Sequence, residues 1–467
     1  MIDIIEQSTF DVLTEEKTIV LTNKQNRTYV KDLNVALNGL LDEAMSDDVV
    51  VLRPSSNIKT KKIVLVKSDV LSCREKRKEL FKKLSDIKED SVYLLDTFEN
   101  DSTEETIYDL TEALLDRQED LILFQSKKKD VNRLISFYGD LDVEKVITKA
   151  FHTTKAVLVT KNLVNAPYNY LNAAKLAAHA KGLEKYDAIS VKIIEKKEIE
   201  SMNMGLFLGV NKGSYDDPKL IYIQYKGLDT FENPTALVGK GVMYDTGGYS
   251  LKTPTSMPGM KGDMAGAAAV LGAIEAIAKL KLKVNLIGIV AATDNRMGEY
   301  AIVPDDILTS AKGLTVEIIS TDAEGRLTLG DAIWFAQKEG AKKVIDVATL
   351  TGAMVAALGG DFTGAFTNDK EFLESFKNAT VNVDESIWEM PVSRAHHKDI
   401  KSDVADIKNK GGKNAGASTA AAFLEEFVEK GTSWIHLDIA GTSSTSNGLA
   451  TGVMVKSFVE YFYLNQQ

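Results

Sequence analysis

The sequence predicts an α/β protein in which an N-terminal α/β domain precedes a larger domain with a mainly parallel central sheet flanked by helices. Its 467 residues exceed what one hydrophobic core usually holds, so two domains are expected. A hydrophobic content of 44% supports fully folded globular domains. In the last two thirds of the chain, strand-like runs alternate with helical patterns. Helices between buried strands indicate a parallel sheet that is covered on both faces.

The first third alternates β-rich runs with amphipathic charged segments. It predicts strands at Thr18–Thr22, Val49–Leu52, Ile63–Val66 and Val92–Leu95, and helices at Arg74–Ile87 and Thr103–Leu121. Its charge runs, such as Lys127–Asp130, indicate solvated faces. From about Val131 to Thr153 the pattern is helical, and it ends near the strand-like run Ala156–Val159. No Pro/Gly/Ser-rich linker marks the junction, so we expect a helix to bridge domains at residues 1–155 and 156–467.

The larger domain shows the strand and helix alternation most clearly. Strands are predicted at Ser190–Ile194, Leu220–Tyr225, Ala236–Gly241, Val284–Ala292, Val344–Thr349 and Trp434–Ile439. Helices are predicted at Ala173–Tyr186, Met264–Leu280, Leu329–Gly340 and Ser418–Lys430. In such sheets ligands collect beyond the carboxyl ends of the strands, and the charged clusters of this sequence fall there.

Composition excludes several classes of function. The 56 basic and 67 acidic residues give a net charge of −11, which argues against a general affinity for nucleic acid or anionic membranes. The single cysteine, Cys73, excludes an internal disulfide and a Cys-rich zinc module. The start, Met1–Glu6, lacks the pattern of a signal peptide, and the apolar run Val347–Gly360 is shorter than the roughly 18 residues of a membrane span. We therefore expect a soluble, cytoplasmic protein.

Three charged residues stand at alternate positions directly after the β-branched run Thr315–Ile319. They are Asp322, Glu324 and Arg326. If the chain is still extended there, a two-residue period directs all three side chains to one side. Two carboxylates at close range resist joint ionisation unless a cation lies between them. A divalent metal ion is the expected cation.

A second charged cluster strengthens the metal hypothesis. An apolar strand that enters a Gly-rich turn delivers Lys240 and Asp245, and Lys252 and Asp263 follow shortly after. Asp263 directly precedes the small-residue helix Met264–Leu280, where an acidic side chain can cap free amides.

The combined set has the chemistry of a metal site. Four carboxylates without histidine or thiolate suit Mg²⁺, Mn²⁺ or Zn²⁺, and their charge is balanced better by two ions than by one. Lys240 would bind a metal only as the neutral amine, whereas Lys252 and Arg326 would stay charged and face an oxyanion. The four acids are Asp245, Asp263, Asp322 and Glu324.

Other chemistries fit the sequence less well. Taken singly, each acid is more typical of a helix cap or a surface charge. Only the four acids together favour a shared metal site. The Gly-Lys-Gly turn lacks the Gly-Lys-Ser/Thr spacing of nucleotide-binding loops, and no Gly-x-Ser-x-Gly elbow exists. His396 and His397 are adjacent, so they cannot both bind one ion. The remaining histidines have no ligand spacing; they are His152, His179 and His436.

The motifs together resemble the signature segments of the leucyl (cytosol) aminopeptidases. The resemblance spans about residues 160 to 460. Three segments carry it most specifically: Val238–Lys252, Met260–Ala268 and Thr321–Leu327. Further similar blocks are Leu163–Leu171, Asp346–Ala353, Lys401–Lys408 and His436–Thr442.

The resemblance implies a metal-dependent aminopeptidase that releases N-terminal, leucine-like residues from short peptides by means of two divalent ions, Mn²⁺ or Zn²⁺, with Mg²⁺ as an option at one site. Lys240 and Asp263 match ligands of the tighter metal. Asp245 and Glu324 match the acids that both metals share, and Asp322 matches the ligand of the exchangeable metal.

The resemblance also assigns catalytic and substrate-binding residues. Lys252 matches the residue that polarises the scissile carbonyl and steadies the tetrahedral intermediate, and Arg326 matches the residue that holds a bicarbonate ion as general base. The family usually forms homohexamers. The wall that holds the peptide matches Met260, Thr349, Leu350 and Gly352.

Two segments depart from the family pattern, and two rival functions stay open. Ser320 stands where asparagine is common, and the loop Asp294–Asp306 differs from the usual sequence. Some bacterial members also contact DNA, so a DNA-binding role is one rival, which the acidic composition disfavours. A structural assembly with an inactive site is the other, and the complete set of matched residues argues against it.

Overall fold

The computed structural model describes residues 2–4, 11, 13, 15–24, 26–37, 39–42, 45, 47–54, 59–60, 62–116, 121, 124, 126 and 133–466. The predicted charge run Lys127–Asp130 lies outside these residues. The chain divides into two compact units, Met1–Lys155 and Ala156–Gln467. Each unit has its own sheet and its own hydrophobic core.

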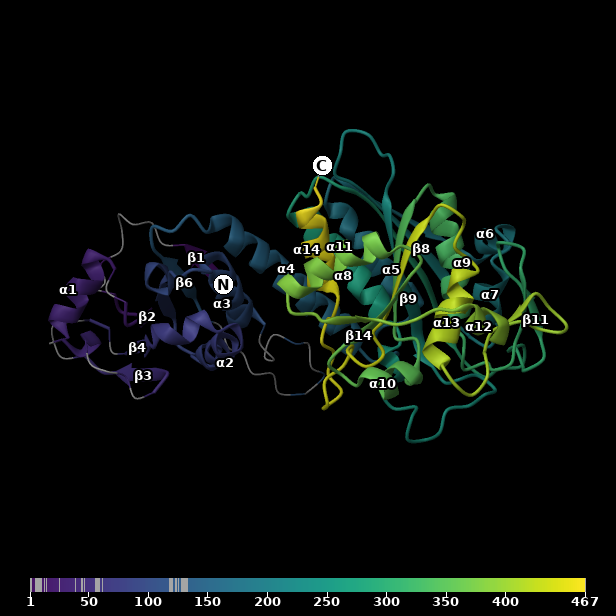
Figure 1. The fold of residues 1–467 in the computed structure, drawn as a ribbon, viewed down its shortest axis with the longest axis horizontal. Helices are drawn as coiled ribbons and strands as arrows, with labels where there is room; N and C mark the ends of the chain where they lie inside the picture. Colours follow the sequence, from purple (N-terminus) through teal and green to yellow (C-terminus); the bar gives the residue numbers. More distant parts are fainter. Residues whose placement is uncertain are drawn as a thin grey trace. The chain divides into compact units, whose positions relative to one another are not determined.

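The first unit contains a six-stranded sheet in the order β1-β6-β5-β2-β4-β3 (Figure 1). All neighbouring strands are parallel except β3 and β4. The strands are β1 (Ile2–Ile4), β2 (Thr18–Thr22), β3 (Val49–Leu52), β4 (Ile63–Val66), β5 (Ser91–Leu94) and β6 (Ile135–Tyr138), and the helices are α1 (Thr28–Ala36), α2 (Arg74–Ser85) and α3 (Thr103–Leu115). In the described part of this unit, short 3₁₀ helices span Leu40–Asp42, Ser68–Ser72 and Leu95–Phe98.

Two sequence predictions near the junction are wrong. The stretch predicted as continuous helix from Val131 contains strand β6, whose aromatic and β-branched residues pair with β5 and β1. The run Ala156–Val159, predicted as a strand, lies inside the long helix α4 (Glu144–Asn165). Four apolar residues in a row fit a buried helix face as well as a strand, so the run alone could not separate them. Helix α4 continues across the division between the two units.

The second unit has an eight-stranded sheet in the order β15-β14-β17-β13-β9-β10-β8-β7. Its central strands β17, β13, β9 and β10 are parallel, which confirms the predicted mainly parallel sheet flanked by helices. Strands β8 and β7 add in antiparallel fashion at one side, and β14 pairs antiparallel with β17. The strands are β7 (Ile189–Ile194), β8 (Lys219–Lys226), β9 (Thr235–Asp245), β10 (Asn285–Asn295), β13 (Lys343–Ala348), β14 (Thr363–Thr367), β15 (Ile387–Glu389) and β17 (Ser433–Asp438).

Helices cover both faces of this sheet (Figure 1). They are α5 (Ala173–Lys181), α6 (Lys196–Ser201), α7 (Gly205–Asn211), α8 (Ala265–Lys279), α9 (Gly325–Lys338), α10 (Gly352–Leu358), α11 (Lys370–Asn382), α12 (Arg394–Asp399), α13 (Gly416–Glu425) and α14 (Val455–Leu464). Short 3₁₀ helices span Gly182–Lys185 and Met260–Gly262. A small sheet is formed by β11 (Ile307–Thr309), β12 (Thr315–Glu317) and β16 (Ile407–Lys408).

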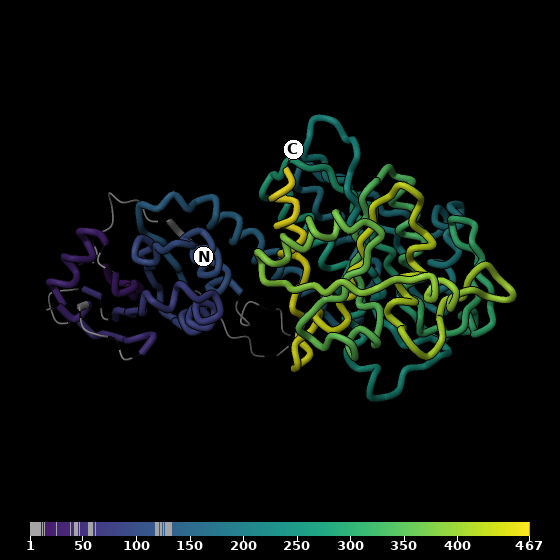
Figure 2. The backbone as a smooth tube through the Cα atoms, in the orientation of Figure 1, coloured from purple at the N-terminus to yellow at the C-terminus, as the bar shows by residue number. Residues whose placement is uncertain are grey.

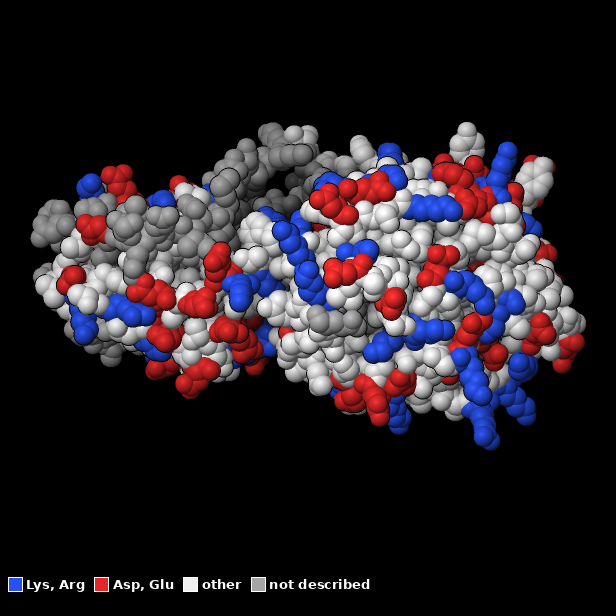
Figure 3. Space-filling view, turned by 90° about the horizontal axis from the view of Figure 1, so that it is seen from above, with Lys and Arg blue, Asp and Glu red and all other residues white. Residues whose placement is uncertain are grey.

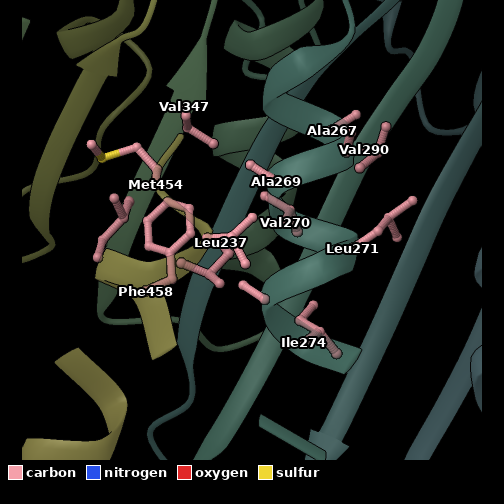
Figure 4. Packing of buried hydrophobic residues seen from close by; sticks show 14 of the residues in the cluster. Leu237, Ala267, Ala269, Val270, Leu271, Ile274, Val290, Val347, Met454 and Phe458 are labelled. Atoms are coloured by element: carbon pink, nitrogen blue, oxygen red, sulfur yellow. The ribbon is translucent and has the colours of Figure 1, made fainter. Parts of the chain in front are cut away.

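Alternate residues of β9 feed two separate cores. Leu237 belongs to the core under α8 and α14, whereas Val238 belongs to the core under α7, α9 and α13. Figure 4 shows Leu237 and Val270 of α8 beside Phe458 of α14. This alternation explains why the parallel strands read as continuous apolar runs in the sequence.

The sheet and helix α8 approach each other closely through glycines. A Cβ added to Gly239 would lie 2.6 Å from the Cα of Ala267, and one added to Gly266 would lie 2.0 Å from the carbonyl oxygen of Val347. Such contacts leave no room for a side chain. They fix the start of α8 directly against the strands β9 and β13.

The described surface carries charges of both signs. Lys, Arg, Asp and Glu side chains are interspersed on the face shown in Figure 3. The tube in Figure 2 shows that the chain ends with α14, within the second unit. Among the described residues, no helix is long and apolar enough to cross a membrane.

Candidate metal and active site

A cavity of about 490 Å³ lies beyond the carboxyl ends of the parallel strands in the second unit. All four predicted acids, both predicted lysines and all four predicted wall residues line it. Its charged lining residues are Lys240, Asp245, Lys252, Lys261, Asp263, Asp322 and Glu324. The four wall residues are Met260, Thr349, Leu350 and Gly352. The sheet topology therefore brings together groups that are far apart in the sequence.

One half of the charged cluster is centred on Lys240. Its Nζ lies 2.7 Å from Oδ1 of Asp263 and 3.0 Å from Oε1 of Glu324, and it donates to the carbonyl oxygen of Thr349 at 3.0 Å. The hydroxyl of Thr349 also donates to Asp263 Oδ1, at 2.8 Å. Burial lowers the pKa of Lys240, but the charges of Asp263 and Glu324 outweigh it, so the pKa lies above its usual value. Without metal, Lys240 is an ammonium ion.

The other half is centred on Lys252. Its Nζ lies 2.8 Å from Oδ2 of Asp245 and 2.5 Å from Oδ1 of Asp322. Burial lowers its pKa as well, yet the two carboxylates raise it above the usual value. Asp322 is the partly exposed member of the cluster, whereas Asp245 and Glu324 are buried.

The two halves meet at the carboxylates. One oxygen from each of Asp245, Asp322 and Glu324 lies within 4.8 Å of the other two, a spacing that fits a shared metal ion. The second oxygen of Asp263, Oδ2, is buried and has no hydrogen-bond partner among the described residues. A buried, unpaired carboxylate oxygen is costly, and a cation would satisfy it. The residues present therefore fit divalent ions.

The segment before α9 is not extended, which corrects the two-residue period used to predict convergence. The chain turns at Thr321 and Asp322, and Glu324 already has helical dihedral angles of −76° and −36°. The side chain of Asn409 holds this turn: its Oδ1 accepts from the amide of Ile319 at 2.8 Å, and its Nδ2 donates to the carbonyl of Ser320 at 2.7 Å. Asp322 and Glu324 still converge, but through a turn.

A glycine lets α9 begin beside the lysine. A Cβ added to Gly325 would lie 2.3 Å from Cε and 2.7 Å from Nζ of Lys240. The absence of a side chain at residue 325 thus makes room for the ammonium group next to Glu324.

The prediction that Asp263 caps α8 is wrong. Helix α8 begins at Ala265 after Met264, and its N-terminus has no side-chain cap. The Asp263 carboxylate instead binds Lys240 and Thr349. Its position just before a helix suggested a cap, but its carboxylate pairs with the ammonium group of Lys240 instead.

Arg326 lies in the first turn of α9 and is buried. Its Nε and Nη1 have no hydrogen-bond partner among the described residues. Burial lowers its pKa to about 10, against the charges of Glu324 and Asp438, so it stays cationic at neutral pH. Arg326 is absent from the cavity lining, and its unpaired donors follow Glu324 by two residues at the start of α9.

The substrate wall is held by a residue that sequence reasoning missed. Asp438, at the end of β17, accepts hydrogen bonds from the amide of Leu350 at 3.1 Å and from the hydroxyl of Thr351 at 2.6 Å. It also accepts from the amide of Ala440, at 3.1 Å. One buried carboxylate thus joins the loops that follow β13 and β17. The motif His436–Thr442 contained it, but nothing in the sequence gave its partner.

Asn295 is a second missed residue. Its Nδ2 donates to Oδ1 of Asp245 at 2.8 Å and to the carbonyl of Thr321 at 3.0 Å. It stands at the end of β10, next to β9, where the parallel register aligns it with Asp245. The amide of Gly247 also donates to Asp245 Oδ1, at 2.8 Å. These bonds fix the orientation of the acid.

The histidines stay outside the acid cluster. His436 is fully buried, and its Nδ1 bonds Oδ1 of Asp346 at 2.6 Å. Trp434 Nε1 donates to the other oxygen of Asp346 at 2.7 Å. His396 takes part in a capping box with Ser393 at the start of α12. No histidine among the described residues lines the cavity.

This open α/β sheet with a carboxylate cluster beyond its strand ends has the features of a metal-binding enzyme. Residues 158–459 match the catalytic domain of the cytosol aminopeptidase family. The chain therefore belongs to that family, and it is a metallo-aminopeptidase. Among solved structures, a variant of tomato leucine aminopeptidase is similar, with 29% identity and a TM-score of 0.83 over 99% of this chain and 96% of the other.

The titration of Asp245 generates a prediction for metal binding. Burial, together with the charge of Glu324, raises the pKa of Asp245 to about 6. This proton must leave before a metal binds, so Asp245 alone should lower the Mn²⁺ affinity about tenfold between pH 7 and pH 5, and a proton lost by Lys240 on metal binding would add to that fall. Calorimetric titration in two buffers of different ionisation enthalpy measures both the affinity and the protons released. Equal affinity at both pH values, without proton release, would contradict the shift.

Proposed function

We propose that this protein is a two-metal aminopeptidase that releases N-terminal, preferentially leucine-like apolar residues from short peptides. The carrying observation is the convergence of four carboxylates and two lysines on one cavity. The family match gives metallo-aminopeptidase activity, and four convergent carboxylates offer enough oxygen ligands for two ions that share them. We assign this activity to residues 156–467 and an accessory role to residues 1–155.

Five residues are proposed as metal ligands: Lys240, Asp245, Asp263, Asp322 and Glu324. Oxygen donors with one amine suit Mn²⁺ or Zn²⁺, and Mg²⁺ is admissible where the ligands are carboxylates alone. When bound, such ions lower the pKa of water and polarise a peptide carbonyl. Lys240 would bind as the neutral amine, and the ammonium seen between Asp263 and Glu324 has to lose its proton for this.

Lys252 is proposed to stabilise the tetrahedral intermediate. It lies at the cavity wall, and its two carboxylate partners, Asp245 and Asp322, are proposed metal ligands. Once metal ions neutralise those acids, the ammonium is free to face a developing oxyanion.

Arg326 is proposed to hold a bicarbonate ion that acts as general base. Two of its donor nitrogens, Nε and Nη1, are buried and unpaired, and a guanidinium donates charge-assisted hydrogen bonds to oxyanions. The bicarbonate would accept a proton from the attacking water and later pass it to the leaving amine.

The apolar part of the cavity supports a leucine-like preference. Carbon-rich side chains line the cavity together with the acid cluster. A free α-amine would bind near the acids, and an apolar first side chain would lie against the carbon-rich wall. The apolar lining residues are Val164, Met260, Leu350, Val355, Ala440 and Ala450.

Three expectations stay predictions for this chain: the homohexamer, the cytoplasmic location and the absence of DNA binding. The interspersed charges of Figure 3 give no support for a DNA-binding face on that side. The inactive-assembly alternative is disfavoured because every proposed ligand is present at the cavity.

The proposed activity predicts metal-dependent hydrolysis of leucyl-p-nitroanilide. Purified protein with Mn²⁺ or Zn²⁺ should release p-nitroaniline, chelation should stop it, and added metal should restore it. The release is followed by absorbance. Folded, metal-loaded protein without turnover would refute the proposed activity.

Two substitutions should separate metal binding from transition-state stabilisation. Glu324→Ala removes a shared ligand, so bound metal and activity should both be lost. Lys252→Met removes only the charge, so metal content should stay while kcat falls about 10² to 10³-fold. Metal is measured by mass spectrometry of the dialysed protein. Substantial metal loss in Lys252→Met, or wild-type rates in Glu324→Ala, would contradict these roles.

The bicarbonate role has its own test. In buffer freed of carbon dioxide the wild-type rate should drop, and added bicarbonate should restore it. Arg326→Met should lower kcat about 10² to 10⁴-fold and abolish the response to bicarbonate. A wild-type rate that is indifferent to bicarbonate would show that another base operates.

A further inference from the structure

Lys261 is a cavity cation that the proposed mechanism does not use. It lies in the 3₁₀ helix Met260–Gly262 and lines the same cavity as the acid cluster. Lys240 and Lys252 each contact two carboxylates, but Lys261 has no carboxylate within ion-pair distance among the described residues. Its ammonium donates only to the carbonyl oxygen of Asn165. An ammonium has three donors, so two remain available.

Asn165 brings a second donor to the same wall. This residue ends helix α4, lines the cavity and is buried. Its Oδ1 accepts from the amide of Ala450 at 3.0 Å, which fixes the side chain, while its Nδ2 has no hydrogen-bond partner among the described residues. A buried amide donor without an acceptor is costly, and an oxygen ligand would satisfy it.

The charge balance of the cavity also favours an anion at this wall. The lining holds four carboxylates and three lysines. Two divalent ions would balance the four carboxylates by themselves, so the ammonium of Lys261 would keep an uncompensated positive charge. The ion pairs with the acid cluster are made by the other two lysines.

We propose that Lys261 and Asn165 form a subsite for a carboxylate of the peptide substrate, an inference that rests on the proposed aminopeptidase function. Charge-assisted hydrogen bonds from an ammonium and an amide suit such a group. Two parts of a peptide supply it: the C-terminal carboxylate of a dipeptide, and the side chain of an acidic first residue. The subsite would lower KM for peptides whose carboxylate can reach Lys261 and Asn165.

An alternative interpretation is that Lys261 has a purely structural role and caps the C-terminus of α4. A lysine that donates to the last carbonyls of a helix stabilises it. A cap alone would affect the stability of the protein and all substrates alike. Substrate-dependent KM values therefore distinguish the two roles.

The experiment compares matched substrates with and without the carboxylate. One pair is Leu-Gly and Leu-Gly-amide; the other is glutamyl-p-nitroanilide and glutaminyl-p-nitroanilide. In the wild type, KM should be lower for the charged member of at least one pair, by roughly tenfold. Lys261→Met keeps the alkyl stem and removes the charge, so that KM ratio should approach one. The pair that responds identifies the source of the carboxylate.

Control variants complete the test. Lys261→Arg keeps a cation and should retain the ratio, and Lys175→Met, at an exposed site on α5, should leave it unchanged. Asn165→Asp keeps the acceptor for Ala450 but replaces a donor with a negative charge. It should therefore weaken the preference for the charged substrate and bring the KM values of each pair closer together. Melting temperatures monitor folding of each variant.

The outcomes separate two failures. If both ratios are near one in the wild type, or stay unchanged in Lys261→Met, the subsite is refuted while hydrolysis of leucyl-p-nitroanilide still supports the aminopeptidase. If leucyl-p-nitroanilide itself is not hydrolysed by metal-loaded wild type, the proposed function fails first.

Discussion

Mutual repulsion among four buried or half-buried carboxylates is the constraint on which the site depends. Like charges at this range cannot all ionise unless cations separate them. Lys240 lies between Asp263 and Glu324, and Lys252 lies between Asp245 and Asp322. The two ammonium groups thus hold the acids in place without metal. Because these carboxylates already surround positive charge, the cluster also suits divalent ions.

The scaffold of the second unit brings these charged groups together. The central parallel strands deliver Lys240 and Asp245 from β9, and the neighbouring strand β10 ends with Asn295 to orient Asp245. Backbone contacts at Gly239 and Gly266 fix the start of α8, so Asp263 stays within reach of Lys240. The loops after β13 and β17 close the cavity and are joined by Asp438.

The sequence predicted the central strands and the cluster well because both leave local signals. An apolar run that ends in Gly-Lys-Gly and an acid marks a strand end, and the acids were found from their spacing. The route of Asp322 and Glu324 into the cluster was predicted wrongly, since Asn409, remote in the chain, folds that segment into a turn. Asp438 and Asn295 were missed because their partners depend on strand register, which residue patterns do not reveal. The strand predicted at Ala156–Val159 is part of helix α4, because four apolar residues in a row fit either structure.

Helix α4 gives the boundary between the units an unusual character. The polypeptide passes from one unit to the other inside a continuous helix, and its last residue, Asn165, reaches the cavity wall. A cut at residue 156 that separated the larger unit would therefore break hydrogen-bonded helical turns rather than a flexible linker. An exchange of modules between relatives would have to carry the whole helix from Glu144, so the two parts are inherited most safely as one piece.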